Sequence, residues 1–268
     1  MRSIRLNCLG LALLFAACGC ASPTFEHADL QHHFRDVGFD GGMIVYDPAR
    51  DRFITIHGPN TERALLPAST FKIFNSLVGL ETGAVADEHE VFKWDGVTRE
   101  RDALNRNHDM ASAFRNSVVW FYQEIARRIG HDRMQRYINA VGYGNRNLGP
   151  KIDTFWLDGD LRISARQQVE FLTRLYRNDL PFSRRTMDIV KQIMISEQTP
   201  KYTLRSKTGW ALRPTEEVGW WVGWVERSNG EVYIFAMNIV AERPNRDQFG
   251  PARMTIAREI LKDLGALP

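Results

Sequence analysis

The order of hydrophobic patterns along the 268-residue chain limits its fold more than any other feature. Strand patterns stand near both ends, and helical patterns fill the middle. At the amino-terminal end, Gly41–Asp47 and Arg52–His57 are β-rich runs joined by the polar turn Pro48–Asp51. At the other end, Gly219–Arg227 and Glu231–Val240 flank an Asn-Gly turn, which is a strong hairpin signal. Both ends of the chain are therefore expected to supply β-hairpins.

Between these hairpins, about residues 65–197, apolar residues recur at three- and four-residue spacing, which predicts helices. The expected elements are helices at Phe71–Leu80, Ala111–Ile129, Asp132–Val141, Ala165–Tyr176 and Arg184–Ile195, a strand at Lys201–Ser206, and a last amphipathic helix at Pro251–Leu264. We expect an α+β fold: an antiparallel sheet built from both chain ends with flanking helices, plus an all-helical region inserted in the middle.

The first 21 residues have the pattern of an export signal. Arg2 and Arg5 precede the apolar run Leu9–Ala17, and small residues follow. We therefore divide the chain into a signal peptide, 1–21, and one domain, 22–268. That apolar run is too short to cross a bilayer, and no other stretch reaches the roughly 20 apolar residues a span needs. Two processing routes stay open: the segment ending at Cys18 resembles a lipoprotein box, whereas cleavage after Ala21 would release the domain.

Cysteines and charge narrow the classes of function. All three cysteines (Cys8, Cys18 and Cys20) lie in the first 21 residues, so the domain is expected to have no disulfide, cysteine metal site or catalytic thiol. The formal net charge is +3, and residues 1–21 hold two arginines and no acid, which leaves about +1 for the rest. A charge so close to zero does not indicate a nucleic acid partner. The seven histidines lack paired metal-ligand spacing, so we expect no metal.

Ser69-Thr70-Phe71-Lys72 is the first motif that can carry chemistry. Pro67 stands just before it and an apolar periodic run follows, so the motif should open a helix. Residues three apart share a helix face, which places the Lys72 amine near the Ser69 hydroxyl. A serine becomes an effective nucleophile when an adjacent base takes its proton. A bare S-x-x-K also occurs by chance in a chain of this length, so it needs companions.

Two further motifs offer such companions. Lys207-Thr208-Gly209 is expected at the end of a strand, where a cation and a hydroxyl suit an anionic substrate group and the glycine permits close approach of backbone. Ser117-Val118-Val119 lies inside the helix expected at 111–129. A rival serine, Ser76, would lie roughly 10 Å from Ser69 along one helix, which is too far for proton transfer. Each motif alone is more often an exposed lysine or a surface serine.

Two more motifs fall in turns between the expected helices. Tyr143-Gly144-Asn145 follows a helical stretch, and Gly144 is a sufficient reason for the helix to end there. Trp156-Leu157-Asp158-Gly159 lies in the loop before the next helix. An indole in such a loop is usually a packing residue, but its N–H needs an acceptor if it is buried.

In this order and spacing, the five motifs resemble the penicillin-recognising serine enzymes. S-x-x-K and K-T-G are shared by that superfamily, and S-x-V, Y-G-N and W-x-x-G are similar to its class D (oxacillinase) β-lactamases. The chain departs from the class A pattern, which has S-D-N at Ser117-Val118-Val119 and a glutamate base that we do not find between residues 130 and 190. The resemblance implies a periplasmic hydrolase of β-lactam antibiotics that confers resistance, as a monomer or a homodimer.

The resemblance also implies a role for each matching residue. Ser69 is the nucleophile, and Lys72, carboxylated by CO2 to N6-carboxylysine, is the general base for acylation and deacylation. Ser117 relays a proton to the leaving nitrogen, and the Trp156 indole N–H donates to the carbamate. The backbone N–H groups of Ser69 and Trp210 form the oxyanion hole. The residues that bind substrate are Val119, Lys207, Thr208, Gly209, Trp210 and Arg253.

Two segments are similar to a carbapenem-hydrolysing branch of the oxacillinases: Asp87–Gly96 and Gly219–Trp224. Asp158 and Arg213 match an acid and an arginine of that branch, and we expect an ion pair between them across the rim of the pocket. Two rival interpretations share the fold: a β-lactam sensor domain that keeps its acyl group, and a cell-wall transpeptidase or carboxypeptidase. Repeated turnover of a chromogenic cephalosporin distinguishes the hydrolase from both.

Overall fold

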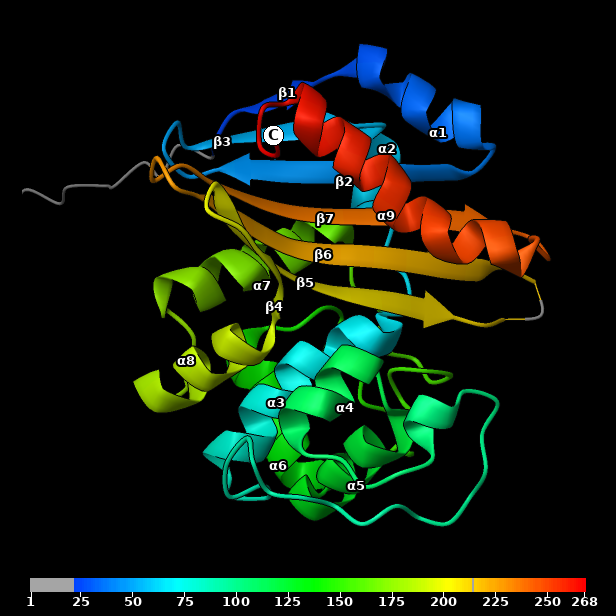
Figure 1. The fold of residues 1–268 in the computed structure, drawn as a ribbon, viewed down its shortest axis with the longest axis vertical. Helices are drawn as coiled ribbons and strands as arrows, with labels where there is room; N and C mark the ends of the chain where they lie inside the picture. Colours follow the sequence, from blue (N-terminus) through cyan, green and yellow to red (C-terminus); the bar gives the residue numbers. More distant parts are fainter. Residues whose placement is uncertain (1–21, 214) are drawn as a thin grey trace, which may run out of the picture.

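The computed structural model describes residues 22–213 and 215–268, which form a seven-stranded sheet with helices on both faces (Figure 1). The strand order is β1-β3-β2-β7-β6-β5-β4, antiparallel from β3 to β4, with β1 parallel to β3. The strands are β1 Thr24–Glu26, β2 Asp40–Asp47, β3 Arg52–Ile56, β4 Ile195–Gln198, β5 Tyr202–Ala211, β6 Glu217–Arg227 and β7 Val232–Ala241. The α+β fold predicted from the sequence is confirmed, with β1 as a parallel addition at one edge.

The helices divide between the two faces of the sheet. The helices α1 and α9 cover one face, and α7 packs against the other (Figure 1). The helices are α1 His32–Val37, α2 Gly58–Glu62, α3 Lys72–Glu81, α4 Met110–Asn116, α5 Val119–Ile129, α6 His131–Val141, α7 Ala165–Arg177, α8 Arg184–Ile193 and α9 Arg246–Asp263. The shorter 3-10 helices are η1 Ala28–Gln31, η2 Ala68–Phe71 and η3 Asp102–Leu104.

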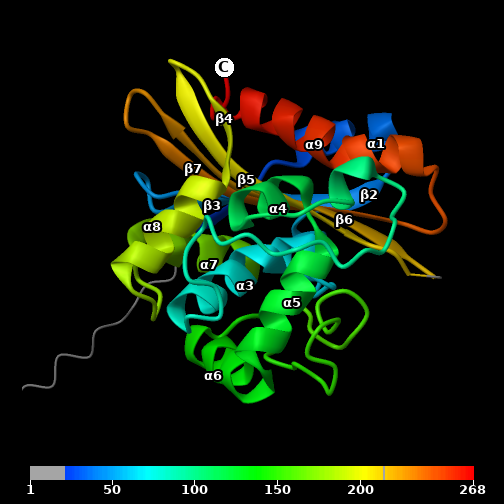
Figure 2. The ribbon, with the colours of Figure 1, turned by 60° about the horizontal axis from the view of Figure 1, so that its bottom comes forward.

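Alternation along the central strands produces two hydrophobic cores. On β2, Met43 and Val45 face the core beneath α1 and α9, whereas Ile44 and Tyr46 face the larger core that contains the helical region. Successive side chains of a strand point to opposite faces, so strands buried on both sides contribute to both cores. In the larger core, α3 packs against α5 and α8 (Figure 2).

The single helix predicted at Ala111–Ile129 is wrong in one respect, because it is broken into α4 and α5. Ser117 has φ 56°, in the left-handed region, and ends α4. Its N–H donates to the Phe114 carbonyl, and the N–H of Val118 donates to the Ala113 carbonyl, which satisfies the last carbonyls of the helix. Ser117 therefore stands on a sharp turn between two helices and not inside one.

Two other predictions of local structure need correction. The turn after α6 is made by Gly142, which has φ 72° and caps the helix; Gly144 comes later. Gly144 is required for another reason, since a Cβ there would lie 2.1 Å from the Arg162 carbonyl oxygen. The Lys207 motif lies within β5, which continues to Ala211, and not at a strand end.

The last helix also begins earlier than predicted. It starts at Arg246, capped by the Asn245 side chain, which accepts from the Asp247 N–H. Pro251 lies inside this helix and does not begin it.

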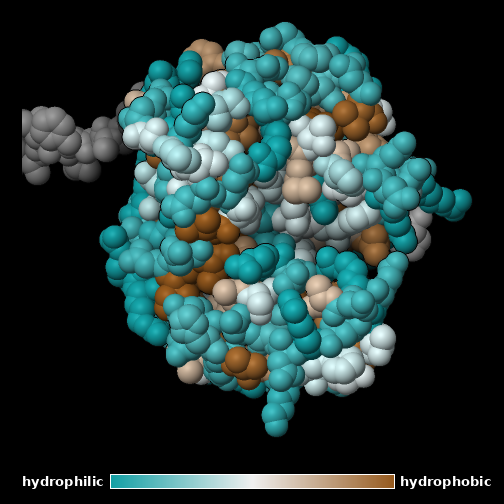
Figure 3. Space-filling view, viewed as in Figure 1, coloured by the Kyte–Doolittle hydropathy of each residue, from teal (hydrophilic) through white to brown (hydrophobic). Residues whose placement is uncertain are grey.

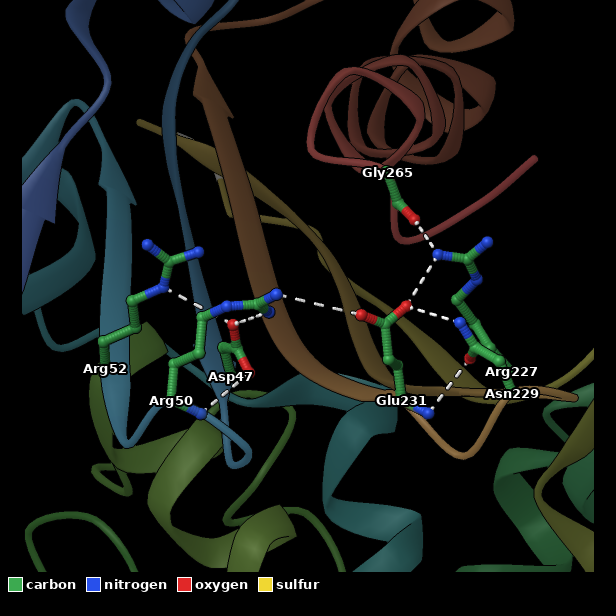
Figure 4. A network of polar contacts seen from close by, with 7 residues as sticks. All are labelled: Asp47, Arg50, Arg52, Arg227, Asn229, Glu231 and Gly265. Carbon is green, nitrogen blue, oxygen red and sulfur yellow. Dashed lines mark hydrogen bonds and ion pairs between the residues drawn. The ribbon is translucent and has the colours of Figure 1, made fainter.

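A polar network ties together two turns and the carboxyl-terminal segment at one end of the sheet (Figure 4). The buried Asp47 carboxylate accepts from Arg50 Nη1 at 2.9 Å and from Arg52 Nε at 3.4 Å. Arg227 Nη1 donates to Glu231 and, also at 2.8 Å, to the Gly265 carbonyl. The network links the β2–β3 turn to the β6–β7 turn through Arg50 and Glu231, 3.9 Å apart.

The predicted signal peptide and the Cys18 lipid site lie outside the described residues. In the part of the chain that the structure describes, none of the helices combines the length and apolar character needed to cross a membrane.

Candidate active site

Ser69 and Lys72 meet where η2 passes into α3. The Lys72 amine donates to Ser69 Oγ at 2.7 Å, and the Lys72 side chain is fully buried while Ser69 is half-buried. Burial, followed by the positive charges of Lys207 and Arg101, lowers the pKa of Lys72 well below its ordinary value. Burial and the neighbouring positive charges therefore favour the neutral amine of Lys72, the form that can accept the proton of the hydroxyl next to it.

The backbone just before Ser69 is strained. Ala68 has φ 48°, in a region that costs a residue with a Cβ roughly 1–2 kcal/mol. The N–H of Ala68 donates to the Trp156 carbonyl at 2.9 Å, and its side chain is fully buried, so the surrounding structure holds this conformation. Strain of this kind collects at functional sites, where it fixes a side chain that local preference would not place.

Ser117 and Lys207 form a second polar pair in this region. The Lys207 amine donates to Ser117 Oγ and to the Thr208 carbonyl, both at 3.1 Å. Burial, together with the charges of Arg253 and Arg101, lowers the pKa of Lys207 to about 7. The left-handed turn at Ser117 and the strand β5 thus bring together two motifs separated by 90 positions in the sequence.

Gly209 lets β5 lie directly against η2. A Cβ at Gly209 would lie 2.9 Å from the Pro67 carbonyl oxygen and 3.1 Å from Thr70 Cγ2, so a larger residue would push the strand away from Ser69. The Gly209 carbonyl accepts from Arg253 Nη1 of α9 at 2.5 Å. Arg253 also lies over the Trp210 ring, 5.3 Å from its centroid, and burial lowers its pKa to about 10.

A cavity of about 410 Å³ lies beside β5, and its lining includes Lys207, Thr208, Arg253, Phe114 and Trp221 but not Ser69 or Lys72. Lys207 and Arg253 provide positive charge for an anionic ligand. The rings of Phe114 and Trp221 provide an apolar surface beside β5. This combination is the usual composition of a site for a small organic ligand.

Trp156 packs against the segment that carries Ser69 and Lys72, through Ala68 and Phe71. Its ring is fully buried and stacks on Phe71, with centroids 5.4 Å apart. Within the described residues its indole Nε1 is buried without a hydrogen-bond acceptor. A buried N–H without a partner costs about 1–3 kcal/mol, so the site has a donor that awaits an anionic or carbonyl acceptor.

Three other residues considered in the sequence analysis lie in the elements around Ser69 and Lys72. Val119 is the first residue of α5, two positions after Ser117, and is half-buried. Tyr143 is buried with its ring edge-on to Phe71 at 5.5 Å. The rival serine, Ser76, is buried and bonded to the Tyr122 hydroxyl at 2.9 Å.

The predicted ion pair between Asp158 and Arg213 is wrong, although the two loops do meet. Arg213 Nη2 donates to the backbone carbonyls of Asp158 at 2.9 Å and of Gly159 at 3.2 Å. A guanidinium can donate to backbone carbonyl oxygens as well as to carboxylates, and a sequence pattern cannot distinguish the two.

Two residues near the site were not singled out in the sequence. The Tyr122 ring lies under the Lys72 amine, 5.4 Å from its centroid. Arg101 bonds to the Asn116 carbonyl at 2.8 Å, and its charge lowers the pKa values of both Lys72 and Lys207. Neither residue belongs to a recognisable motif. A search of residues 22–213 and 215–268 finds no cluster of three or more metal-ligating side chains.

Comparison with known proteins gives consistent matches. Residues 41–262 match the family model of the penicillin binding protein transpeptidase domain. The chain is 41% identical to beta-lactamase OXA-48 of Klebsiella pneumoniae over all of both chains, and 45% identical to beta-lactamase OXA-10 of Pseudomonas aeruginosa over 92% of both. Its fold matches the crystal structure of the class D β-lactamase YbXI from Nostoc with a TM-score of 0.85 and 47% identity, over 90% of this chain and 100% of that one.

Proposed function

Because this chain belongs to the class D serine β-lactamases, and so hydrolyses β-lactam antibiotics, we propose that it does so through a covalent acyl-enzyme on Ser69. The observation that carries the proposal is the contact of 2.7 Å between Ser69 Oγ and the buried amine of Lys72. Ser69 Oγ attacks the lactam carbonyl and loses its proton to a base at Lys72. The C–N bond of the ring then breaks, and water later releases the acyl group as an acid.

Ser117 is positioned to supply the proton that the leaving nitrogen needs. Its hydroxyl accepts from Lys207 at 3.1 Å, so its own proton can point toward the substrate. The oxyanion that forms on the lactam carbonyl is bound by the backbone N–H groups of Ser69 and Trp210. One such donor typically contributes roughly 10²–10³ in rate.

Lys207, Thr208 and Arg253 bind the substrate carboxylate, with Val119, Gly209 and Trp210 as the other residues that bind substrate. The arrangement of β5 supports this role, because Arg253 is held against the Gly209 carbonyl next to the Lys207 amine. Charge-assisted bonds of this kind are short and directional, and so orient the ring for attack.

The residues around Lys72 fit its carboxylation by CO2, and no other cofactor is proposed. Carboxylation would give Lys72 an anionic oxygen that serves as general base in both acylation and deacylation. Only a neutral amine reacts with CO2, and burial favours that form by lowering the pKa of Lys72. The buried Trp156 indole N–H has the donor that such an oxygen requires, and its lack of an acceptor among the described residues supports the assignment.

We further propose that residues 1–21 are a signal peptide that directs the domain 22–268, with its helical region at about 65–197, to the periplasm. Support comes from the arginines and apolar run of that segment. The domain is then released after Ala21 or anchored by a lipid at Cys18.

Slow hydrolysis of carbapenems is a second proposed activity. It rests on the segments Asp87–Gly96 and Gly219–Trp224, and on the contact of Arg213 with the loop of Trp156, which holds two rims of the site together.

Intact-protein mass spectrometry with benzylpenicillin tests the acyl-enzyme. Wild-type protein should show one adduct that decays and re-forms with turnover, and Ser69→Ala should show none. Ser76→Ala is the matched control, because this serine lies about two helical turns beyond Ser69 and bonds to the Tyr122 hydroxyl. An adduct on Ser69→Ala would place the nucleophile elsewhere, and an adduct that never decays would indicate a sensor.

A further inference from the structure

The loop between Trp94 and His108 carries a cation to the rim of the active site. Its two ends are joined by an isolated bridge between Phe92 and His108, and Asp95 and Arg99 form an ion pair within it. In Figure 1 the loop projects beyond α4 and α5 on the side away from the cap formed by α1 and α9, and Figure 3 shows the surface hollowed between this loop and the sheet.

Arg101 connects this loop to the turn at Ser117, between α4 and α5. Its Nη2 donates to the Asn116 carbonyl at 2.8 Å, and Asn116 is joined by its peptide bond to Ser117, whose hydroxyl meets Lys207. The guanidinium charge lowers the pKa values of Lys72 and Lys207 alike. Arg101 is therefore within electrostatic range of both lysines at the centre of the site.

The charge of Arg101 is not neutralised by a carboxylate as that of Arg99 is. Arg99 bonds to both carboxylate oxygens of Asp95, at 2.8 and 2.6 Å. Arg101 is exposed, and across the described ranges its guanidinium bonds to a backbone carbonyl and to no carboxylate. An arginine has five N–H donors, so most of them remain available to a ligand.

We propose that Arg101 forms a second anion subsite, which selects β-lactams that carry a carboxylate on the acyl side chain. Lys207, Thr208 and Arg253 line a cavity beside the sheet, whereas Arg101 bonds to the Asn116 carbonyl, on the helical side of Ser117. On this proposal the ring carboxylate is bound on the sheet side, and a carboxylate bound by Arg101 belongs to the acyl side chain. This proposal rests on turnover of β-lactams at Ser69.

The test compares kcat/KM for three penicillins that share a phenylacetyl side chain and differ at its α-carbon. The α-carbon carries a carboxylate in carbenicillin, hydrogen in benzylpenicillin and an ammonium group in ampicillin. In Arg101→Ala, the kcat/KM of carbenicillin relative to benzylpenicillin should fall about fivefold, the upper value for one exposed ion pair. The ratio for ampicillin should rise, because a repulsion is removed.

Arg106→Ala is the matched control, because Arg106 is an exposed cation of the same loop whose charge acts on His108. It should leave both ratios unchanged, and Arg101→Lys should retain most of the carbenicillin preference. Unchanged ratios in Arg101→Ala, or an equal change in Arg106→Ala, would overturn the subsite. If wild-type protein turned over none of the three penicillins, the proposed acyl-enzyme function itself would fail.

Discussion

Three basic side chains lie around Ser69 and Ser117, and burial lowers the pKa of each below its ordinary value: Lys72, Lys207 and Arg253. Like charges brought together in a site of low dielectric repel one another and favour loss of a proton. The repulsion between these groups lowers the stability of the protein without ligand. An anionic substrate, or carboxylation of Lys72 to an anion, reduces that repulsion. Activity and stability are therefore opposed at these positions.

If the Trp156 indole N–H donates to a carbamate on Lys72, both carboxylation and activity should depend on bicarbonate. Bicarbonate labelled with ¹³C should give a carbamate signal in the NMR spectrum of wild-type protein, and added bicarbonate should raise activity. Trp156→Phe should need roughly 10–100-fold more bicarbonate, as expected for the loss of one bond to a charged group, and should deacylate slowly. Trp94→Phe is the control, because that indole donates to the Val97 carbonyl. A full carbamate signal in Trp156→Phe would contradict the assignment.

Lys207 predicts the alkaline side of the pH profile. Because its pKa is about 7 in the folded protein, the ammonium form exists below pH 7 and is lost as the pH rises above it. The kcat/KM, which reports groups of the unliganded enzyme, should therefore fall above about pH 7 for substrates with a ring carboxylate. In Lys207→Arg the fall should move to higher pH, since a guanidinium stays charged. An identical alkaline limb in both proteins would assign it to another group.

At the level of elements, the site depends on the turn at Ser117 between α4 and α5, which no sequence pattern predicts. The pattern from Ala111 to Ile129 is continuous, and serine has no strong preference for the left-handed region at φ 56°. The break is imposed by packing of α4 and α5 against different neighbours, with α4 beside α8 and α5 beside α3. Local periodicity therefore predicted helical structure on both sides of Ser117, as one helix, but could not predict the turn that divides it.

The contact between the β5–β6 loop and the Trp156 loop gives a prediction for carbapenem turnover. Arg213→Ala should lower the kcat/KM of imipenem by roughly three- to tenfold, because it removes charge-assisted bonds that join two loops. Asp158→Ala should change it by less than about twofold, since Arg213 bonds to the Asp158 backbone and not to its carboxylate. Equal losses in both variants would restore the ion pair predicted from the sequence.

At the scale of the whole molecule, the polar network of Figure 4 predicts a loss of stability without a loss of catalysis. Arg227 pairs with Tyr202 in the sheet, six residues from Thr208 and so roughly 20 Å away along β5. Asp47→Ala should lower the free energy of unfolding by about 1–3 kcal/mol, because it leaves bonded cations without their buried carboxylate.

Urea denaturation and kcat/KM at 25 °C check this prediction. The control is Asp132→Ala, whose carboxylate is 93% exposed and should change stability by less than about 0.5 kcal/mol. A variant at Asp47 with lowered kcat/KM and an unchanged urea midpoint would contradict the separation of network and site.

The sequence predicted the architecture and the motif residues because both depend on local patterns. The central hairpins follow from alternation and an Asn-Gly turn, and Ser69 and Lys72 meet because three residues make one helical turn. It did not predict β1, β4, α1 or α2, which are short elements whose stability comes from tertiary packing. Arg101 was not identified as a candidate site residue, because a single arginine in a charged loop belongs to no recognisable sequence pattern.

The pairing of β2 with β7 has a consequence for the timing of folding. Asp40 lies beside Val240, so the centre of the sheet joins segments synthesised some 200 residues apart. At 5–20 residues per second, roughly 10–40 s separate their emergence from the ribosome. During that interval the β2–β3 hairpin exposes an open edge and an apolar face, and cannot close the sheet alone. The sheet therefore cannot close until the segment that forms β7 is available to pair with β2.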